Sequence, residues 1–213
     1  LNANRYWDEM IRYYANIVGK YGNPVQKALQ KLSDIDIRMI CSTHGPVWTE
    51  QKANAVDIYD RLSRYEGING VTIAYGNMYG HTEQMAETIA SALSEEGIRE
   101  IAMHDVRNTH VSYILRDIFN YKGVIIGSPT YSTQIFPGID FLLNQIALRD
   151  VRNRLFGYFG SFTWAVAAVK RLAAFGEDMK WEMVGNPVEQ KQNISADEEC
   201  FELGKARARR LLQ

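Results

Sequence analysis

The feature that most constrains this fold is a regular alternation of apolar runs and amphipathic helices after Gly70. Strand-like runs are expected near residues 71–75, 99–104, 122–127, 154–159 and 180–184. Helical patterns are expected near residues 81–95, 111–119, 137–148, 165–176 and 195–212. Several of the apolar runs are continuous, which is typical of a sheet covered on both faces. The pattern therefore predicts an α/β fold with a doubly wound, five-stranded parallel sheet and right-handed crossovers.

Residues 1–68 follow a different pattern. Apolar and aromatic residues recur at helical spacing in two stretches, Tyr6, Met10, Tyr13, Tyr14 and Ile17, then Val25, Ala28, Leu29 and Leu32. One strand candidate, residues 37–40, has no partner strand in this segment, and a lone strand needs a sheet. We expect a mostly helical remnant of a larger domain whose body lies upstream, followed by a second domain at residues 69–213.

Composition excludes several classes of function. A formal net charge of −1 gives no electrostatic reason to expect nucleic acid or an anionic membrane as partner. No apolar run approaches the ~20 residues needed to cross a bilayer, and no signal-peptide pattern opens the chain. The two cysteines, Cys41 and Cys200, lie far apart with no CxxC spacing, so neither a disulfide framework nor a thiolate metal site is indicated. A cytoplasmic location is therefore expected.

A small, polar turn joins the run 71–75 to the next helix and indicates a phosphate-binding loop. Free backbone N–H groups and the positive end of the helix dipole converge at such a turn. Gly80 permits close backbone approach, Thr82 offers a hydroxyl, and Asn77 offers a side-chain amide. The candidate ligand-binding residues of this loop are Asn77, Met78, Tyr79, Gly80, His81 and Thr82. The spacing fits neither a Walker loop nor the G-x-G-x-x-G fingerprint of dinucleotide sites.

Two further segments follow predicted strand ends and carry aromatic residues suited to covering a flat ring. Their candidate residues are Ser128, Pro129, Thr130, Tyr131 and Ser132, then Gly160, Ser161, Phe162, Thr163 and Trp164. In an open α/β sheet, ligands bind at the carboxyl ends of the strands beside the topological switch point. A phosphate seat combined with an aromatic ring clamp favours FMN as the cofactor.

The phosphate loop resembles that of flavodoxins, which have the strand order 2-1-3-4-5. The whole chain is similar to the C-terminal part of flavodiiron proteins (A-type flavoproteins). The stretches that carry this resemblance are residues 13–22, 42–48 and 59–66, the phosphate loop, residues 127–131 and residues 160–164. Such proteins join a metallo-β-lactamase-like domain, which holds a non-haem diiron site, to a flavodoxin-like FMN domain. They reduce O2 to water or NO to N2O.

The resemblance assigns His44 to the last histidine ligand of the diiron site. The family's H-x-E-x-D-H cluster is absent, and the other histidines, His81, His104 and His110, lie in the FMN half. Because ligand count decides metal binding, this chain is expected to hold no diiron site unless the upstream domain is present. Asn77 stands where flavodoxins usually have a hydroxyl, and Thr163 stands where a glycine is expected.

The leading functional hypothesis is an FMN-binding electron-transfer domain of a flavodiiron oxidoreductase. The resemblance implies a separate donor protein, rubredoxin-like or a reductase, and a homodimer. A first alternative is a self-contained flavodoxin-like NAD(P)H–quinone reductase, which would oxidise NAD(P)H in isolation. A second alternative is a non-catalytic flavodoxin-like interaction module, which would bind no flavin.

Overall fold

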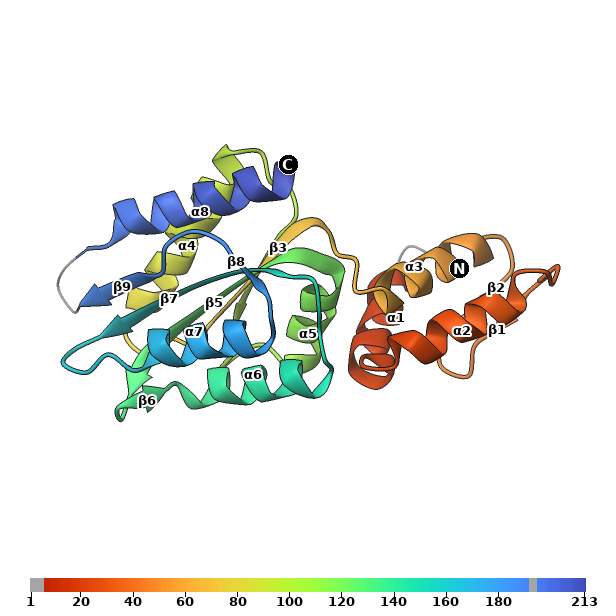
Figure 1. Cartoon of the computed structure of the whole chain (residues 1–213), viewed down its shortest axis with the longest axis horizontal. Coiled ribbons are helices and arrows are strands. Elements are labelled where there is room, and N and C mark those ends of the chain that lie inside the picture. Colours follow the sequence, from red (N-terminus) through yellow and green to blue (C-terminus); the bar gives the residue numbers. More distant parts are fainter. Residues whose placement is uncertain (1–5, 192–194) are drawn as a thin grey trace.

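The computed structural model describes residues 6–191 and 195–213, and its main body is a parallel sheet between two helical layers (Figure 1). The strands are β3 (Ile68–Tyr75), β4 (Ile101–Asp105), β5 (Tyr121–Tyr131), β7 (Leu155–Phe162), β8 (Glu182–Met183) and β9 (Val188–Lys191). They run in the order β4-β3-β5-β7-β8, and β9 also pairs with β7. All of these pairings are parallel. The sheet therefore confirms the predicted 2-1-3-4-5 order.

Helices cover both faces of the sheet. One face packs against α4 (His81–Glu95) and α8 (Asp197–Leu212), which lie side by side in Figure 1. The other face packs against α5 (Val111–Asn120), α6 (Pro137–Leu148) and α7 (Ala168–Asp178). Ile73 and Ile125 of the central strands point into the α4–α8 core, whereas Ala74 and Ile126 point into the other. This alternation explains why the central strands read as continuous apolar runs.

The fifth strand position differs from the sequence prediction. One strand was expected over residues 180–184, but two short strands, β8 and β9, pair with the two halves of β7. Gly185, with a φ of +76°, turns the chain between them, and Pro187 has no N–H to donate to a ladder. The consequence is that residues 188–191, which the sequence pattern left outside the sheet, reach its carboxyl edge.

Two segments expected as loops are extensions of strands. β5 continues to Tyr131 because Gly127–Pro129 pair with β7 and Tyr131 pairs with Gln134 of the short strand β6 (Gln134–Ile135). For the same reason β7 includes residues 160–162. The next helix begins at Ala168 rather than at residue 165, since the Thr130 hydroxyl accepts hydrogen bonds from the N–H groups of Ala167 and Ala168.

The N-terminal segment contains four helices and a small hairpin within its described residues. These are α1 (Trp7–Tyr13), the π-helix η2 (Tyr14–Val18), α2 (Gly22–Leu32), β1 (Ile40–Cys41), β2 (Val47–Trp48) and α3 (Lys52–Ser63). β1 pairs with β2 in antiparallel fashion, so the prediction of an unpartnered strand near residues 37–40 is wrong. The turn through Gly45, with a φ of +132°, brings the two strands together.

Part of this segment belongs to the same core as the sheet. Ile11 of α1 and Tyr14 of η2 are buried in one apolar cluster with Leu115 and Phe119 of α5. The fully buried Arg154 guanidinium donates to the carbonyls of Ile118, Phe119 and Tyr65, which ties α5 to the end of the segment. The expected domain boundary at residues 68/69 remains a prediction, but side-chain packing crosses it.

Candidate functional site

A cavity of about 300 Å³ lies at the carboxyl ends of β3, β5 and β7. It brings together residues from all three predicted segments: Met78, Tyr79, His81, Thr82, Pro129, Thr130, Tyr131, Ser132, Ser161, Phe162, Thr163 and Trp164. These residues come from chain segments about 30 to 90 positions apart, and the parallel sheet places them at one edge. The cavity therefore coincides with the site that the strand order predicts.

The phosphate loop ends in an open helix start. Gly80 precedes α4 with a φ of +92°, and a Cβ on it would have no atom within 4 Å. Among the described residues, none accepts a hydrogen bond from the backbone N–H of His81 or Thr82. The Thr82 hydroxyl lies 3.1 Å from the Ser161 hydroxyl and so joins this loop to the end of β7. Unpaired N–H groups at a helix start form an anion seat.

Asn77 shapes this loop from within. Its side-chain oxygen accepts from the Gly80 N–H at 2.8 Å, and its amide donates to Glu83 at 2.6 Å. Tyr75 also donates to Glu83, at 3.3 Å, and burial together with the nearby carboxylate raises the pKa of Tyr75 to about 12. The Asn77 amide, expected to face a ligand, is instead directed to Glu83, and Asn77 does not line the cavity.

Three aromatic side chains border the cavity and are unusually exposed. Trp164 is 86% exposed, Tyr79 84% and Tyr131 45%. Large aromatic surfaces are normally buried, because each ring contributes a substantial hydrophobic stabilisation when it leaves water. Their grouping around one cavity is typical of a site for a planar ring.

Three other predicted residues lie behind the cavity wall or outside it. Ser128 is fully buried, and its hydroxyl donates to the Pro129 carbonyl and accepts from the Phe136 N–H. Gly160 allows two strands to approach, since a Cβ there would lie 2.9 Å from the Ser128 carbonyl oxygen. Gly80 is also absent from the cavity lining, although its φ sets the direction in which α4 begins.

The structure adds three residues to the cavity that the sequence pattern missed: Thr133, Ala165 and Gln190. Gln190 is a buried polar residue on β9, and its neighbours Glu189 and Lys191 are exposed. Residues 188–191 contain one apolar residue and carry no strand pattern of their own in the sequence, because only a partner strand makes four such residues stable as a strand.

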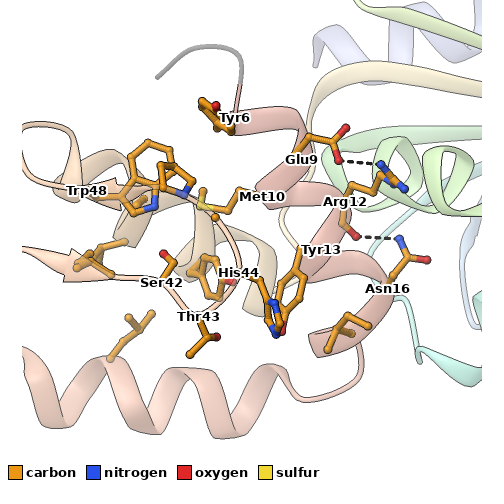
Figure 2. A pocket seen from close by; sticks show the side chains of 18 of the residues that line it. Tyr6, Glu9, Met10, Arg12, Tyr13, Asn16, Ser42, Thr43, His44 and Trp48 are labelled. Carbon is orange, nitrogen blue, oxygen red and sulfur yellow. Dashed lines mark hydrogen bonds and ion pairs between the residues drawn. The ribbon is translucent and has the colours of Figure 1, made fainter. Parts of the chain in front are cut away.

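A second cavity, of about 760 Å³, is lined by the N-terminal segment together with His110 and Ser112 at the start of α5 (Figure 2). His44 lines it and packs against Tyr13, with ring centroids 5.5 Å apart. Trp7 stacks on Trp48 at 4.3 Å beside it. No group of three or more histidine, cysteine, aspartate or glutamate side chains is placed to hold a metal ion within residues 6–191 and 195–213. In the same ranges, no helix is both long enough and apolar enough to cross a membrane.

Comparison with protein families decides the class of the chain. The flavodoxin family profile matches residues 73–204, which is the part that holds the sheet and the first cavity. This chain belongs to the flavodoxin family. The match starts within β3 and ends within α8, so it covers the phosphate loop and both aromatic segments of this flavodoxin-family chain.

Its curated relatives are longer proteins. A nitric oxide reductase of Moorella thermoacetica is 27% identical over 99% of this chain and 54% of its own length. A rubredoxin-oxygen oxidoreductase of Megalodesulfovibrio gigas is 32% identical over 85% of this chain and 46% of its own length. The chain thus spans about half the length of the curated relatives it matches.

Solved structures of longer proteins also resemble this chain. The rubredoxin oxygen:oxidoreductase of Desulfovibrio gigas superposes on the entire chain with a TM-score of 0.92, at 29% identity and over 54% of its own length. The flavodiiron protein of Giardia intestinalis shares the fold, with a TM-score of 0.90 over the entire chain and 53% of its own length, at 22% identity. This flavodoxin-family chain aligns with the C-terminal half of flavodiiron proteins, which confirms the resemblance found in the sequence.

Proposed function

We propose that the chain binds FMN in the cavity at the carboxyl edge of the sheet and transfers electrons through it. One observation carries this proposal: three predicted segments form one cavity that combines an open helix start with exposed aromatic rings. FMN has a phosphate monoester at one end and a flat three-ring system at the other, so it needs both features in one site.

The phosphate end fits the start of α4. The backbone N–H groups of His81 and Thr82 are free to donate, and the Thr82 hydroxyl can exchange its contact with Ser161 for a phosphate oxygen. Open space at Gly80 lets the phosphate approach the backbone. Among the described residues, no lysine or arginine lines the cavity, so backbone dipoles would provide most of the stabilisation.

The flavin ring of FMN fits the part of the cavity bordered by aromatic side chains. Tyr131 and Trp164 border it from β5 and from the segment after β7, and both present aromatic surface to solvent. Bound FMN would accept electrons in pairs and release them singly, while the chain contributes orientation and electrostatics. Thr163, beside Trp164, also lines the cavity and would add side-chain volume next to a bound flavin.

The wider role follows from the relatives. We infer that the chain acts as the flavin part of an oxidoreductase related to the nitric oxide and oxygen reductases that it matches. The reduction of O2 or NO would take place at a diiron site, and His44 would contribute one ligand only together with a metallo-β-lactamase-like domain. An electron-donor protein and a homodimer belong to the same proposal.

The proposal is tested by titrating FMN into the flavin-free full chain and measuring flavin fluorescence and the melting temperature. Quenching and a raised melting temperature are expected, because a ligand that binds only the folded state stabilises it. Thr82→Ala should weaken FMN binding about tenfold, which is typical of one lost hydrogen bond to a charged group. Ser91→Ala, a hydroxyl deletion at an exposed position of the same helix, should have no effect. Unchanged fluorescence and melting temperature at saturating FMN would refute the proposal.

A further inference from the structure

His81 occupies a distinctive position in this cavity. It is the first residue of α4, directly before Thr82, and it is half-buried in the cavity wall. Among the described lining residues, it is the one side chain able to carry a positive charge. The other titratable side chains that line the cavity are Tyr79 and Tyr131.

The charged groups on neighbouring elements do not line the cavity. Asp197, Glu198 and Glu199 stand in the first turn of α8, which packs along α4, and all three are exposed. Glu83, two residues along α4, accepts hydrogen bonds from Asn77 and Tyr75. Arg107, in the segment after β4, forms an ion pair with Asp105, and neither residue lines the cavity. On β9, Glu189 and Lys191 are exposed on either side of Gln190, and only Gln190 reaches the cavity. In the described structure, the cavity itself therefore holds no carboxylate and no permanent cation.

We infer that His81 sets the affinity of this site for a phosphate monoester and makes that affinity depend on pH. This inference rests on the proposed binding of FMN. Imidazole changes its charge between about pH 5 and pH 8, whereas backbone N–H groups do not titrate. When His81 is protonated, its N–H donates a charge-assisted hydrogen bond and its charge adds to the dipole of α4. When it is neutral, the phosphate is held by dipoles alone.

The charge of His81 determines the direction in which FMN affinity should change with pH. A protonated imidazole attracts the phosphate and a neutral one does not, so at acid pH FMN should bind more tightly to the wild type than to a variant without the imidazole. The phosphate of FMN also titrates near pH 6 and loses part of its charge in acid. The comparison must therefore be made between variants at each pH rather than between pH values for one protein.

The experiment measures FMN dissociation constants by fluorescence quenching at pH 5.5 and pH 8.5 for the wild type, His81→Asn and His81→Lys. His81→Asn keeps a neutral donor, so its affinity should equal that of the wild type at pH 8.5 and be about tenfold weaker at pH 5.5. His81→Lys carries its charge at both pH values, so it should bind more tightly than the wild type at pH 8.5. His110→Asn removes a histidine outside this cavity and keeps a helix-capping side chain, so it should match the wild type at both pH values.

Riboflavin, which lacks the phosphate, separates a phosphate effect from a ring effect. None of the His81 variants should change the riboflavin dissociation constant. A His81→Asn effect of equal size at both pH values, or one shared by riboflavin, would overturn the role of the imidazole charge and leave FMN binding intact. Failure of every variant and of the wild type to bind FMN would overturn the proposed function and this inference with it.

Discussion

At the scale of single residues, the candidate site is organised by hydrogen bonds among the side chains of its loops. Asn77 accepts from the Gly80 N–H and donates to Glu83, so its hydrogen bonds fix the path of the loop. The hydroxyls of Thr82 and Ser161 connect two chain segments in the cavity lining. The backbone N–H groups of His81 and Thr82 are left free to meet an anion, and these side-chain hydrogen bonds fix the loop that carries them.

The Ser132–Thr133 turn between β5 and β6 places two adjacent residues in a strained backbone conformation. Both residues have a positive φ, +49° and +60°, which side chains with a Cβ rarely adopt and which is especially costly for a β-branched residue. Both residues line the cavity. The chain thus retains a costly turn at its candidate site.

Thr133→Gly should stabilise the chain by about 1 kcal/mol, because glycine adopts a positive φ without steric cost. Urea unfolding followed by circular dichroism measures this change. Thr49→Gly is the control, since Thr49 is exposed and does not have a positive φ. At position 49, glycine should lower stability, because it raises the conformational entropy of the unfolded chain without relieving any strain. Equal effects at the two positions would show that the turn is not strained.

At the scale of helices and strands, a buried ionic cluster joins β4 to α5. His104 on β4 lies 2.7 Å from Asp117 on α5, and Arg116 contacts the same carboxylate through two nitrogens. Burial alone would raise the pKa of Asp117, but the hydrogen bonds from His104 and Arg116 lower it below its usual value. The carboxylate is therefore charged in the folded chain at neutral pH.

Asp117→Asn should lower stability at pH 7 by about 2 kcal/mol, because it removes the buried carboxylate that pairs with His104 and with the half-buried Arg116. A lowered folded-state pKa adds stability that is present above the ordinary aspartate pKa, about 3.9, and is lost as the pH falls through the folded-state value. The difference between wild type and variant should therefore shrink below about pH 4. Urea unfolding from pH 7 to pH 2.5 measures it, with Asp57→Asn, at an exposed position on α3, as control. A difference that stays constant with pH would contradict this account.

At the scale of the whole molecule, the N-terminal segment and the sheet share a core. Ile11 is 6% exposed and belongs to the cluster that contains Leu115, Phe119 and Ile126. Arg12 donates to the Ser112 hydroxyl, and Arg149 donates to the Ala15 carbonyl. These contacts predict that α1 and η2 unfold together with the sheet.

Ile11→Ala should lower the free energy of unfolding by roughly 2–4 kcal/mol, which is typical of a large-to-small change in a packed core. Ile17→Ala is the matched control, because Ile17 is 61% exposed and its loss should cost less than about 0.5 kcal/mol. Chemical unfolding should shift as a single transition when it is followed both by circular dichroism and by tryptophan fluorescence. Two separate transitions, with only the smaller one shifted, would show that the segment is an independent unit.

Local patterns in the sequence determined the parallel sheet and showed that the candidate site lies at the carboxyl ends of its strands. Continuous apolar runs such as residues 122–127 need burial on both faces, and the helices at 81–95 and 137–148 begin and end as the pattern predicts. The phosphate loop could also be found, because a glycine and a hydroxyl at a strand–helix junction are local features.

Tertiary contacts decided the rest. β8 and β9 are too short to be stable alone and exist because β7 pairs with both, so Gln190 could not be placed in the site from its own neighbourhood. Asn77 is directed to Glu83 by a hydrogen bond that only the folded loop offers. The sharing of one core by α1 and α5 depends on contacts about 100 residues apart along the chain. The spacing of apolar residues indicates which face of a helix or strand is buried. Which other element packs against that face depends on how the whole chain folds.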